Sequence, residues 1–299
     1  MTALAERTRT LLDAAALDVD DVRRVVRTAL DEDLRYGPDA TTAATVPADV
    51  VAQAELRARS AGVLAGAPAA LAVFDAVLGD GYDVLDVRPD GAALAAGESA
   101  LVLRGPVRGL LTAERTALNL LCHLSGIATA TATWVAAVEG TGCAIRDSRK
   151  TLPGLRLLQK YAVRAGGGVN HRMGLGDAVL IKDNHVVAAG SVAAALRAAR
   201  EHAPSLACEV EVDTLAQLDE ALAAGADEVL LDNFAPADCA DAVRRRDAVS
   251  PSTRLEASGG LRLDVAHSYA ETGMDYLAVG ALTHSSPALD LGMDLHTER

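Results

Sequence analysis

Apolar and polar residues follow two different patterns along the chain, and the change comes near residue 142. Before it, apolar and polar residues alternate in short runs at 51–66, 82–94 and 98–107, separated by Gly, Pro and Asp. Such alternation predicts half-buried strands. Residues 20–30 and the second half of 60–80 predict helices, and residues 36–47 predict a loop rich in turn residues. Together these patterns predict a small α+β domain.

Two helical patterns follow Pro106, at 109–126 and 128–140. Six short apolar or β-branched runs come next, with helical segments such as 191–203 and 214–226 between them. Alternating strands and helices predict βαβ units and a parallel sheet. The six predicted strands are 143–147, 178–182, 207–212, 227–232, 254–258 and 275–280.

Polar or small residues stand at the end of every one of these six runs. In a barrel all strand ends converge on one face, whereas in an open sheet only those beside the switch point do. We therefore favour a barrel over a doubly wound sheet, and the chain has no dinucleotide-binding fingerprint. The residues concerned are Arg149 and Lys150, Lys182, Glu211, Asp232, Ser258 and Gly280.

Charge and composition exclude several classes of protein. The formal net charge of −13 argues against a nucleic-acid surface, which needs a basic footprint. No apolar run approaches the roughly 18 uncharged residues of a membrane span, and the charged N-terminus predicts no signal peptide. The four cysteines, at 122, 143, 208 and 239, lack metal-binding spacing and are predicted to be reduced core residues.

Positive charge gathers between Arg146 and Lys182, where eight basic residues face two acidic ones. The three lysines of the chain, Lys150, Lys160 and Lys182, all lie in this stretch. A solvated surface is the simpler explanation of such a cluster. Because glycines and apolar runs separate the charges, we favour a pocket for an acidic small molecule.

Two segments of this stretch offer cations to an anion. Arg149 and Lys150 are adjacent, so they point in different directions and can hold two anionic groups. The glycine-rich segment 166–185 supplies His171, Arg172 and Lys182. Each charge-assisted hydrogen bond contributes about 1.5–3 kcal/mol, so three or four would hold a dianion at micromolar affinity.

Carboxylates and glycines follow the later strands. Glu211 and Asp232 can bind a divalent cation or offset positive charge on a sugar ring. We expect Glu209 to face away from Glu211 and to be structural. The glycines in 256–260 and 278–285 expose backbone N–H groups, which suits a phosphate.

Taken together, these segments resemble the quinolinate phosphoribosyltransferase family. The similarity extends from residue 31 to residue 294 and is strongest at 114–129, 147–185, 209–227, 230–234 and 255–260. Family motifs usually have Thr where this chain has Ser148 and Ala257. Ser148 keeps a hydroxyl group, whereas Ala257 loses one and puts a minor contact in doubt.

The resemblance implies an α/β fold, an incomplete, TIM-like α/β barrel of seven parallel strands with a smaller N-terminal α+β sandwich domain. We expect the sandwich at 1–116, joined by the tail 285–299, and the barrel at 117–284. The family resemblance also implies that the protein is a cytoplasmic homodimer. The implied activity is that of a pentosyltransferase: quinolinate and phosphoribosyl pyrophosphate give nicotinate mononucleotide, pyrophosphate and CO₂, in NAD biosynthesis.

Family roles carry over onto matching positions. The quinolinate carboxylates would be bound by Arg149, His171, Arg172 and Lys182, with Arg115 donated by the partner subunit. Lys150, Glu211 and Asp232 would be the catalytic residues that serve the ribose, the pyrophosphate and Mg²⁺, the two carboxylates being metal ligands. The 5′-phosphate would be bound by Ser258, Gly259, Gly280 and His284.

Three alternatives remain at this stage. A paralogue of the same fold, such as the one linked to molybdate transport, would use another acceptor. A barrel aldolase or lyase would use Lys150 or Lys182 as a Schiff base, which needs a depressed lysine pKa. A ligand sensor without catalytic activity would have no use for the carboxylates Glu211 and Asp232.

Overall fold

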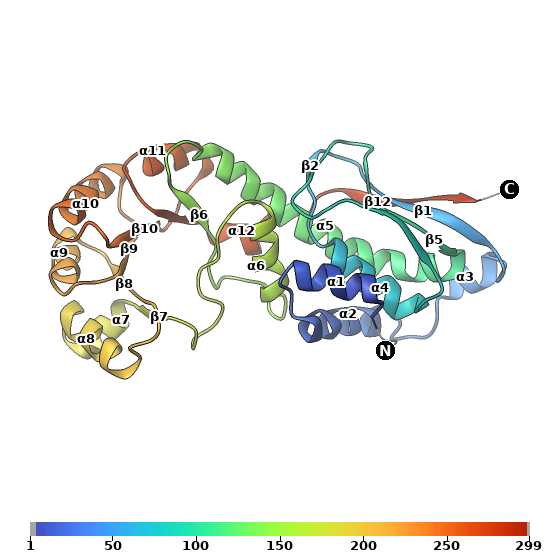
Figure 1. The fold of residues 1–299 in the computed structure, drawn as a ribbon, viewed down its shortest axis with the longest axis horizontal. Coiled ribbons are helices and arrows are strands. Elements are labelled where there is room, and N and C mark those ends of the chain that lie inside the picture. The colour runs from blue at the N-terminus through green and yellow to red at the C-terminus, as the bar shows by residue number, and fades with distance from the viewer. Residues whose placement is uncertain (1–3, 298–299) are drawn as a thin grey trace. The chain divides into compact units, whose positions relative to one another are not determined.

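The computed structural model (Figure 1) describes residues 4–297, and within them the chain divides into two compact units. The first unit comprises Met1–Ala132, Thr151–Gly167 and Leu282–Arg299, as far as these segments are described. The second comprises Thr133–Lys150 and Gly168–Ala281. The chain thus enters the second unit twice, and residues from both passages supply the predicted site.

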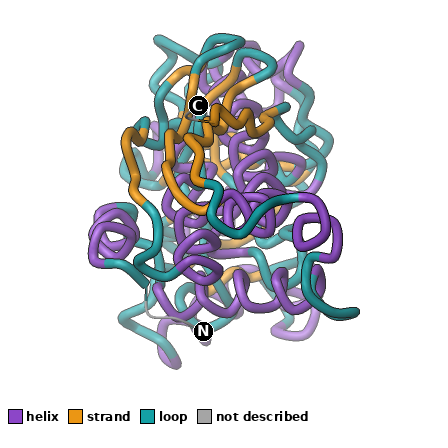
Figure 2. Tube along the Cα trace, turned by 90° about the vertical axis from the view of Figure 1, so that its right-hand side faces the viewer, coloured by secondary structure: helices purple, strands orange, loops and turns teal. Residues whose placement is uncertain are grey.

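The first unit contains an antiparallel sheet, with its strands in the order β12-β1-β5-β3 over residues 4–297. Alternate residues of β1 are buried, as the sequence pattern predicted. Figure 2 looks toward this unit and shows the strands in orange and the helices in purple. The strands are β1 (Val51–Ala58), β2 (Gly62–Val63), β3 (Asp83–Val87), β4 (Ala93–Leu94), β5 (Ser99–Pro106) and β12 (Leu291–Thr297).

The helices of this unit correct one detail of the prediction. Residues 36–47, predicted as a loop, contain the short helix α3, whose N-terminus is capped by Asp39. The N-terminus of α2 is capped by Asp18, which accepts hydrogen bonds from the backbone N–H groups of Asp20 and Asp21. The helices are α1 (Glu6–Ala14), α2 (Val19–Asp33), α3 (Ala40–Thr45), α4 (Ala67–Leu78), α6 (Arg156–Ala165) and most of α12 (Ala281–His284).

The two helices predicted after Pro106 form one continuous helix, α5 (Val107–Ala137). The sequence suggested a break at Gly126, because glycine often ends a helix. In the structure the backbone at Pro287 and Ala288 packs against this position. Gly126 is therefore a site of close packing within the helix rather than its end.

By length and composition α5 could cross a membrane, and an 18-residue window in it has a mean hydropathy of 1.3. This finding corrects the expectation that charged residues interrupt every such stretch, because residues 116–138 contain no Asp, Glu, Lys or Arg. Many of its residues are buried within the protein, among them Leu110, Leu118, Leu121 and Leu124. We conclude that α5 is a core helix.

The second unit contains a parallel sheet, whose order over the described residues is β6-β11-β10-β9-β8-β7. All six strands agree with the prediction: β6 (Ala144–Arg146), β7 (Val179–Ile181), β8 (Cys208–Val212), β9 (Glu228–Asp232), β10 (Arg254–Ser258) and β11 (Tyr276–Ala278). The helices are α7 (Asp183–Ala189), α8 (Val192–His202), α9 (Leu215–Ala223), α10 (Pro236–Val249), the 3₁₀ helix η1 (Leu263–Val265) and α11 (Ala266–Ala270).

The parallel sheet is not closed, because β6 and β7 form its two edges within residues 4–297. A seventh strand, implied by the resemblance, is absent from this described range. On the open side of β6 an isolated parallel bridge joins Val169 to Arg146. The fold is therefore an incomplete α/β barrel, as predicted.

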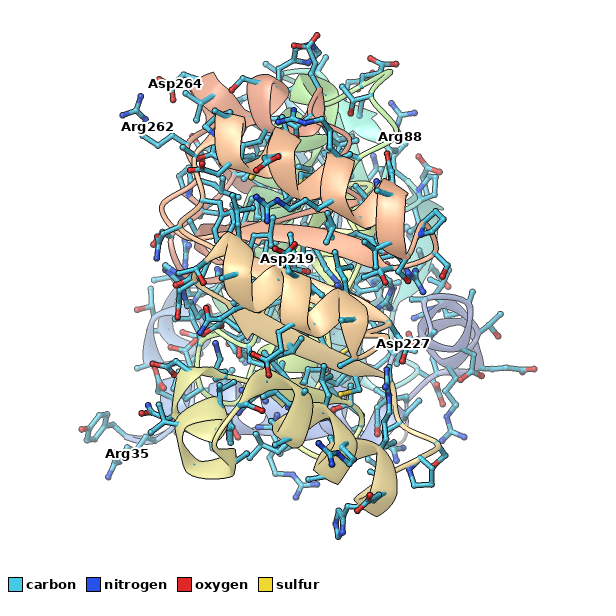
Figure 3. All side chains as sticks on the ribbon, turned by 90° about the vertical axis from the view of Figure 1, so that its left-hand side faces the viewer. Arg35, Arg88, Asp219, Asp227, Arg262 and Asp264 are labelled. Carbon is cyan, nitrogen blue, oxygen red and sulfur yellow. The ribbon has the colours of Figure 1, made fainter. Side chains whose placement is uncertain are left out.

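The two faces of this sheet differ in chemistry. One face is covered by α8, α9 and α10, which lie side by side in Figure 3, where Asp219 projects from α9 and pairs with Arg245. This face is apolar, with Ile145, Ile181, Val210, Val229, Leu255 and Leu277 buried on it. The strand registers place charged or polar residues on the other face: Arg146, Glu209, Glu211, Glu228, Asp232, Glu256 and Ser258.

Candidate active site

Two arginines of the second unit form the most strongly cationic part of the predicted site. Arg149 follows β6 and Arg172 lies in the loop before β7, and both are half-buried. Burial lowers the pKa of the Arg172 guanidinium, and the charge of Arg149 lowers it further. In the described part of the chain, Nε of each arginine is buried without a hydrogen-bond partner. These buried donors suit an anion such as a carboxylate.

The loop that carries Arg172 is fixed by its neighbours. Asp147, fully buried after β6, accepts from the backbone N–H of His171 at 2.8 Å and from Nδ2 of Asn170 at 2.6 Å. Nε2 of His171 lies 2.7 Å from a carboxylate oxygen of Glu209. Arg172 donates from Nη1 to the carbonyl oxygen of Ala178. His171 and Arg172 thus lie next to each other on a well-anchored loop.

Glu209 contradicts our sequence interpretation. We expected it to face away from Glu211, but residues two apart on a strand point to the same side. Both glutamates lie on the polar face of the sheet, where Glu209 contacts His171 and Glu211 forms an ion pair with Lys182. Glu209 therefore belongs to the candidate site.

Asp232 and Ser258 stand side by side at the ends of β9 and β10, where they are paired in register. Asp232 is half-buried and accepts a hydrogen bond from Nδ2 of Asn233 at 2.8 Å. The backbone N–H of Asn233 donates to the carbonyl oxygen of Ser258 at 2.9 Å. This contact joins the two strand ends on which the predicted metal and phosphate residues lie.

Gly259 is required by its surroundings. Its φ of +93° lies in the left-handed region that favours glycine. A Cβ at this position would also lie 2.7 Å from Cγ of Asn233 and closer still to Oδ1. The chain after β10 can therefore approach Asn233 closely, which leaves its backbone amides as candidates for phosphate binding.

Lys150 and Gly280 lie at the ends of the two neighbouring strands β6 and β11. Lys150 is exposed, and its backbone N–H donates to Oγ of Ser148, the residue that replaces the usual Thr. Gly280 follows β11 directly. Within the second unit, every predicted site residue thus lies at or just beyond the carboxyl end of a strand of the parallel sheet, or in the loop that precedes one.

Two predicted residues, Arg115 and His284, belong to the first unit. Arg115 is exposed on α5, and His284 is exposed at the end of α12, where Nδ1 contacts Oγ of Ser285. Their roles remain predictions that rest on the family resemblance.

The basic residues between Arg146 and Lys182 are divided between the two units. Three of them lie on α6, in the first unit: Arg156, Lys160 and Arg164. Lys160 is completely buried, and Arg164 stacks over the ring of Tyr161. Lys160 therefore offers no exposed charge to an anion, which corrects the sequence interpretation for this residue.

A buried charge network on the polar face was not predicted. Arg146 forms ion pairs with Glu228 and Glu256, and its pKa is raised by these charges although burial opposes the shift. Burial raises the pKa of Glu256 to about 8. The alternation of charged residues within β8, β9 and β10 was the sequence signal that could have revealed this network.

Comparison with known families distinguishes between the alternative functions considered for this site. The model of the quinolinate phosphoribosyl transferase C-terminal domain matches residues 127–294, and that of the N-terminal domain matches residues 39–125. The chain belongs to the quinolinate phosphoribosyltransferase family. This membership confirms the predicted family and the predicted activity, decarboxylating phosphoribosyl transfer to quinolinate that yields nicotinate mononucleotide.

Individual family members are similar over nearly their whole length. The nicotinate-nucleotide pyrophosphorylase [carboxylating] of Mycobacterium leprae is 60% identical over 93% of this chain and 98% of its own. A probable enzyme of the same name from Bacillus subtilis is 44% identical over 81% and 83%. The structure of nicotinate-nucleotide pyrophosphorylase from Francisella tularensis has a TM-score of 0.88 and 38% identity, covering 94% of this chain and 98% of that one.

Proposed function

We propose that this member of the quinolinate phosphoribosyltransferase family binds the two carboxylates of quinolinate with Arg149, Arg172 and Lys182. The observation that carries the proposal is the pair of half-buried arginines whose buried Nε donors have no partner within the described chain. The two guanidinium groups repel each other. An anion between them therefore reduces this repulsion and also accepts hydrogen bonds from both groups. A dicarboxylate supplies two such anions.

Phosphoribosyl pyrophosphate is proposed to bind at the ends of β9, β10 and β11. Ser258, Gly259 and Gly280 would hold the 5′-phosphate through a hydroxyl group and backbone amides. The close packing of Gly259 on Asn233 supports this assignment, since a side chain there would block the approach. Barrels frequently bind phosphate at the loops after their final strands.

Mg²⁺ is the proposed metal, and the carboxylates of Glu211 and Asp232 fit it. Mg²⁺ prefers oxygen ligands, usually one or two carboxylates together with waters and substrate phosphates. Leu230 pairs with Glu211 and precedes Asp232 by two residues, so both carboxylates are on the polar face. When bound, the ion would neutralise negative charge that develops on the departing pyrophosphate.

The proposed mechanism relies on positioning and electrostatics. The pyridine nitrogen attacks C1 of the ribose as the C1–O bond to pyrophosphate breaks. Glu211 and Asp232 face the positive charge that develops on the sugar, and Lys150 serves the pyrophosphate. The 2-carboxylate then leaves the cationic ring as CO₂, and the ring carbon takes up a proton. Arg149 and Arg172 hold the ring in place for both steps.

Two further parts of the proposal concern assembly and location. The enzyme is proposed to act as a homodimer in which Arg115 of one subunit completes the quinolinate site of the other. Arg115 is exposed on α5, as a residue offered to a partner must be. The reaction is assigned to the cytoplasm.

A barrel aldolase or lyase is disfavoured by the surroundings of its candidate lysines. A Schiff-base lysine is activated by an apolar environment or by cationic neighbours. Lys150 and Lys182 are exposed, and Lys182 forms an ion pair with Glu211. Neither lysine therefore has the apolar surroundings that would activate it.

Release of CO₂ from quinolinate labelled in the 2-carboxyl group tests the proposal. We expect release that requires both phosphoribosyl pyrophosphate and Mg²⁺, with one nicotinate mononucleotide formed per CO₂. Label retained in the acceptor, or turnover with another acceptor in preference to quinolinate, would contradict it. Arg244→Ala, which removes an exposed arginine of α10 that pairs with Asp241, is the control and should react at the normal rate.

A further inference from the structure

Asn233, which directly follows β9, has a left-handed backbone. Its φ of +58° costs free energy for any residue with a side chain, although Asn tolerates it better than most. Among the non-glycine residues within 4–297, Ala16 alone shares a positive φ, and it lies just beyond α1, where helices often end in such backbone. Asn233 follows a strand instead. Glycine would make the same turn without strain, which indicates that the side chain of Asn233 has a use.

The side-chain amide of Asn233 lies between Asp232 and Gly259. Nδ2 donates to Oδ2 of Asp232 at 2.8 Å. Because an ionised carboxylate accepts hydrogen bonds and cannot donate them, this contact fixes which end of the amide faces Asp232. Oδ1 faces Gly259, where an added Cβ would collide with it. The absence of a side chain at residue 259 therefore leaves room for the amide.

Burial does not impose this arrangement. Asn233 is exposed, so water could satisfy both polar atoms of its amide. Its backbone N–H donates to the carbonyl oxygen of Ser258 at 2.9 Å, which holds the residue against the end of β10. Asn233 is thus bonded through its backbone to the end of β10 and through its side chain to the carboxylate at the end of β9.

We propose that Asn233 is a positioning residue, which orients the carboxylate of Asp232 for Mg²⁺. The inference rests on the proposed function, in which Asp232 is a metal ligand. The amide occupies Oδ2 and restricts rotation of the carboxylate, so that Oδ1 keeps a fixed direction for a cation. Carboxylates that bind metals are commonly hydrogen-bonded in turn by neighbouring groups, and loss of such a partner typically lowers metal affinity or activity about 10–100-fold.

Direct contact between Asn233 and the pyrophosphate is the competing explanation. Nδ2 has two protons, so it could donate to a phosphate oxygen as well as to Asp232. On the side of Gly259, however, the amide presents Oδ1, an acceptor that repels an anionic oxygen. The observed orientation therefore favours the positioning role.

Calorimetry of phosphoribosyl pyrophosphate binding, at saturating Mg²⁺ and without quinolinate, tests the proposal. Asn233→Gly is the variant, because Gly adopts the left-handed backbone and keeps the N–H that is bonded to Ser258. We expect binding about tenfold weaker than to the parent protein. Quinolinate, measured separately, should bind as to the parent. Unchanged binding of phosphoribosyl pyrophosphate, or an equal loss for both ligands, would overturn the proposal.

The same substitution in an Asp232→Ala background distinguishes positioning from direct contact. Asp232→Ala alone should weaken phosphoribosyl pyrophosphate binding more than Asn233→Gly does. If Asn233 acts through Asp232, adding Asn233→Gly to this background should change the affinity by less than about twofold. A further loss of about tenfold would show that Asn233 acts independently of Asp232, against the proposal.

The parent protein and Asp232→Ala also test the proposed function separately. If the parent binds phosphoribosyl pyrophosphate equally well with and without Mg²⁺, or if Asp232→Ala binds it as the parent does, the proposed metal site fails. Mg²⁺-dependent binding that is lost in Asp232→Ala but kept in Asn233→Gly would leave the metal site intact and contradict the role of Asn233 alone.

Discussion

The ammonium group of Lys182 forms an ion pair with the carboxylate of Glu211, although sequence analysis assigned the two residues to different substrates. Lys182 was assigned to quinolinate, and Glu211 to Mg²⁺ and the ribose. In the protein without substrates, Lys182 and Glu211 neutralise each other's charge. Binding of the two substrates must therefore separate or rearrange the pair.

Lys182→Gln should weaken the binding of quinolinate and strengthen the binding of Mg²⁺ at the same time. We expect the KM for quinolinate to rise about tenfold through loss of a charge-assisted contact. The Mg²⁺ concentration for half-maximal activity should fall about two- to fivefold, since a partly exposed ion pair contributes up to about 1 kcal/mol. Steady-state kinetics with each component varied in turn measures both. An unchanged Mg²⁺ requirement would remove Glu211 from the metal site.

Gly259→Ala should destabilise the protein and damage the phosphate site. Both the left-handed backbone and the contact with Asn233 oppose a side chain there. Gly97→Ala is the matched control, because Gly97 has a similar φ of +90° and open space around it. In urea unfolding Gly259→Ala should lose about 1–3 kcal/mol more than Gly97→Ala. Its KM for phosphoribosyl pyrophosphate should also rise. Equal losses in the two variants would show that packing on Asn233 is unimportant.

Gly126→Ala should destabilise the first unit even though Ala favours helix by about 1 kcal/mol. The new Cβ would lie 2.9 Å from Cα of Ala288 and closer still to the carbonyl oxygen of Pro287, and backbone cannot move aside easily. We expect a net loss of about 1–3 kcal/mol in urea unfolding. Gly109→Ala, whose Cβ would meet the flexible end of Leu78, should change stability by less than about 1 kcal/mol. A more stable Gly126→Ala protein would contradict the packing.

Glu256 should make the protein less stable as the pH rises. Burial raises its pKa from the ordinary value of 4.5 to about 8, the nearby charge of Glu209 adds to the shift, and Arg146 and His171 oppose it. Between these two values the folded state holds a proton that the unfolded state has released. The free energy of unfolding therefore falls with increasing pH across this window, by at most about 1.4 kcal/mol per pH unit.

Glu256→Gln removes this proton and should flatten the pH dependence. Urea unfolding at pH 5.5 and pH 8 measures the free energy of unfolding for both proteins. We expect the parent protein to lose more stability than the variant between the two conditions. Identical losses would show that Glu256 carries no extra proton in the folded state.

Periodicity was sufficient to predict the strands of the second unit. Each strand is short and apolar on one face, so its pattern reflects burial against the helices that cover the sheet. The break predicted within α5 was wrong because the packing of Gly126 on Pro287 depends on residues 161 positions away in the sequence. Helix propensity depends on the local sequence and gives no information about a contact with such distant residues.

Part of the candidate site could also be predicted from the strand pattern. Residues at strand ends, such as Arg149 and Asp232, were found because parallel strands bring their carboxyl ends together. Glu209 was misassigned because its neighbour Glu211 was treated as its opposite, although a strand has a period of two. Lys160 lies in the first unit because the chain leaves the second unit after Lys150 and returns to it at Gly168. The distribution of charge along the sequence does not reveal this path.

Isothermal titration calorimetry of the Arg172→Ala variant tests the central claim most directly. The claim is that two half-buried arginines, Arg149 and Arg172, form a site for a dicarboxylate. Quinolinate should bind at least about tenfold more weakly than to the parent protein, because a charge-assisted contact of about 1.5–3 kcal/mol is lost. Phosphoribosyl pyrophosphate should bind as before, and Arg244→Ala should bind both normally. Unchanged quinolinate affinity in Arg172→Ala would contradict the account.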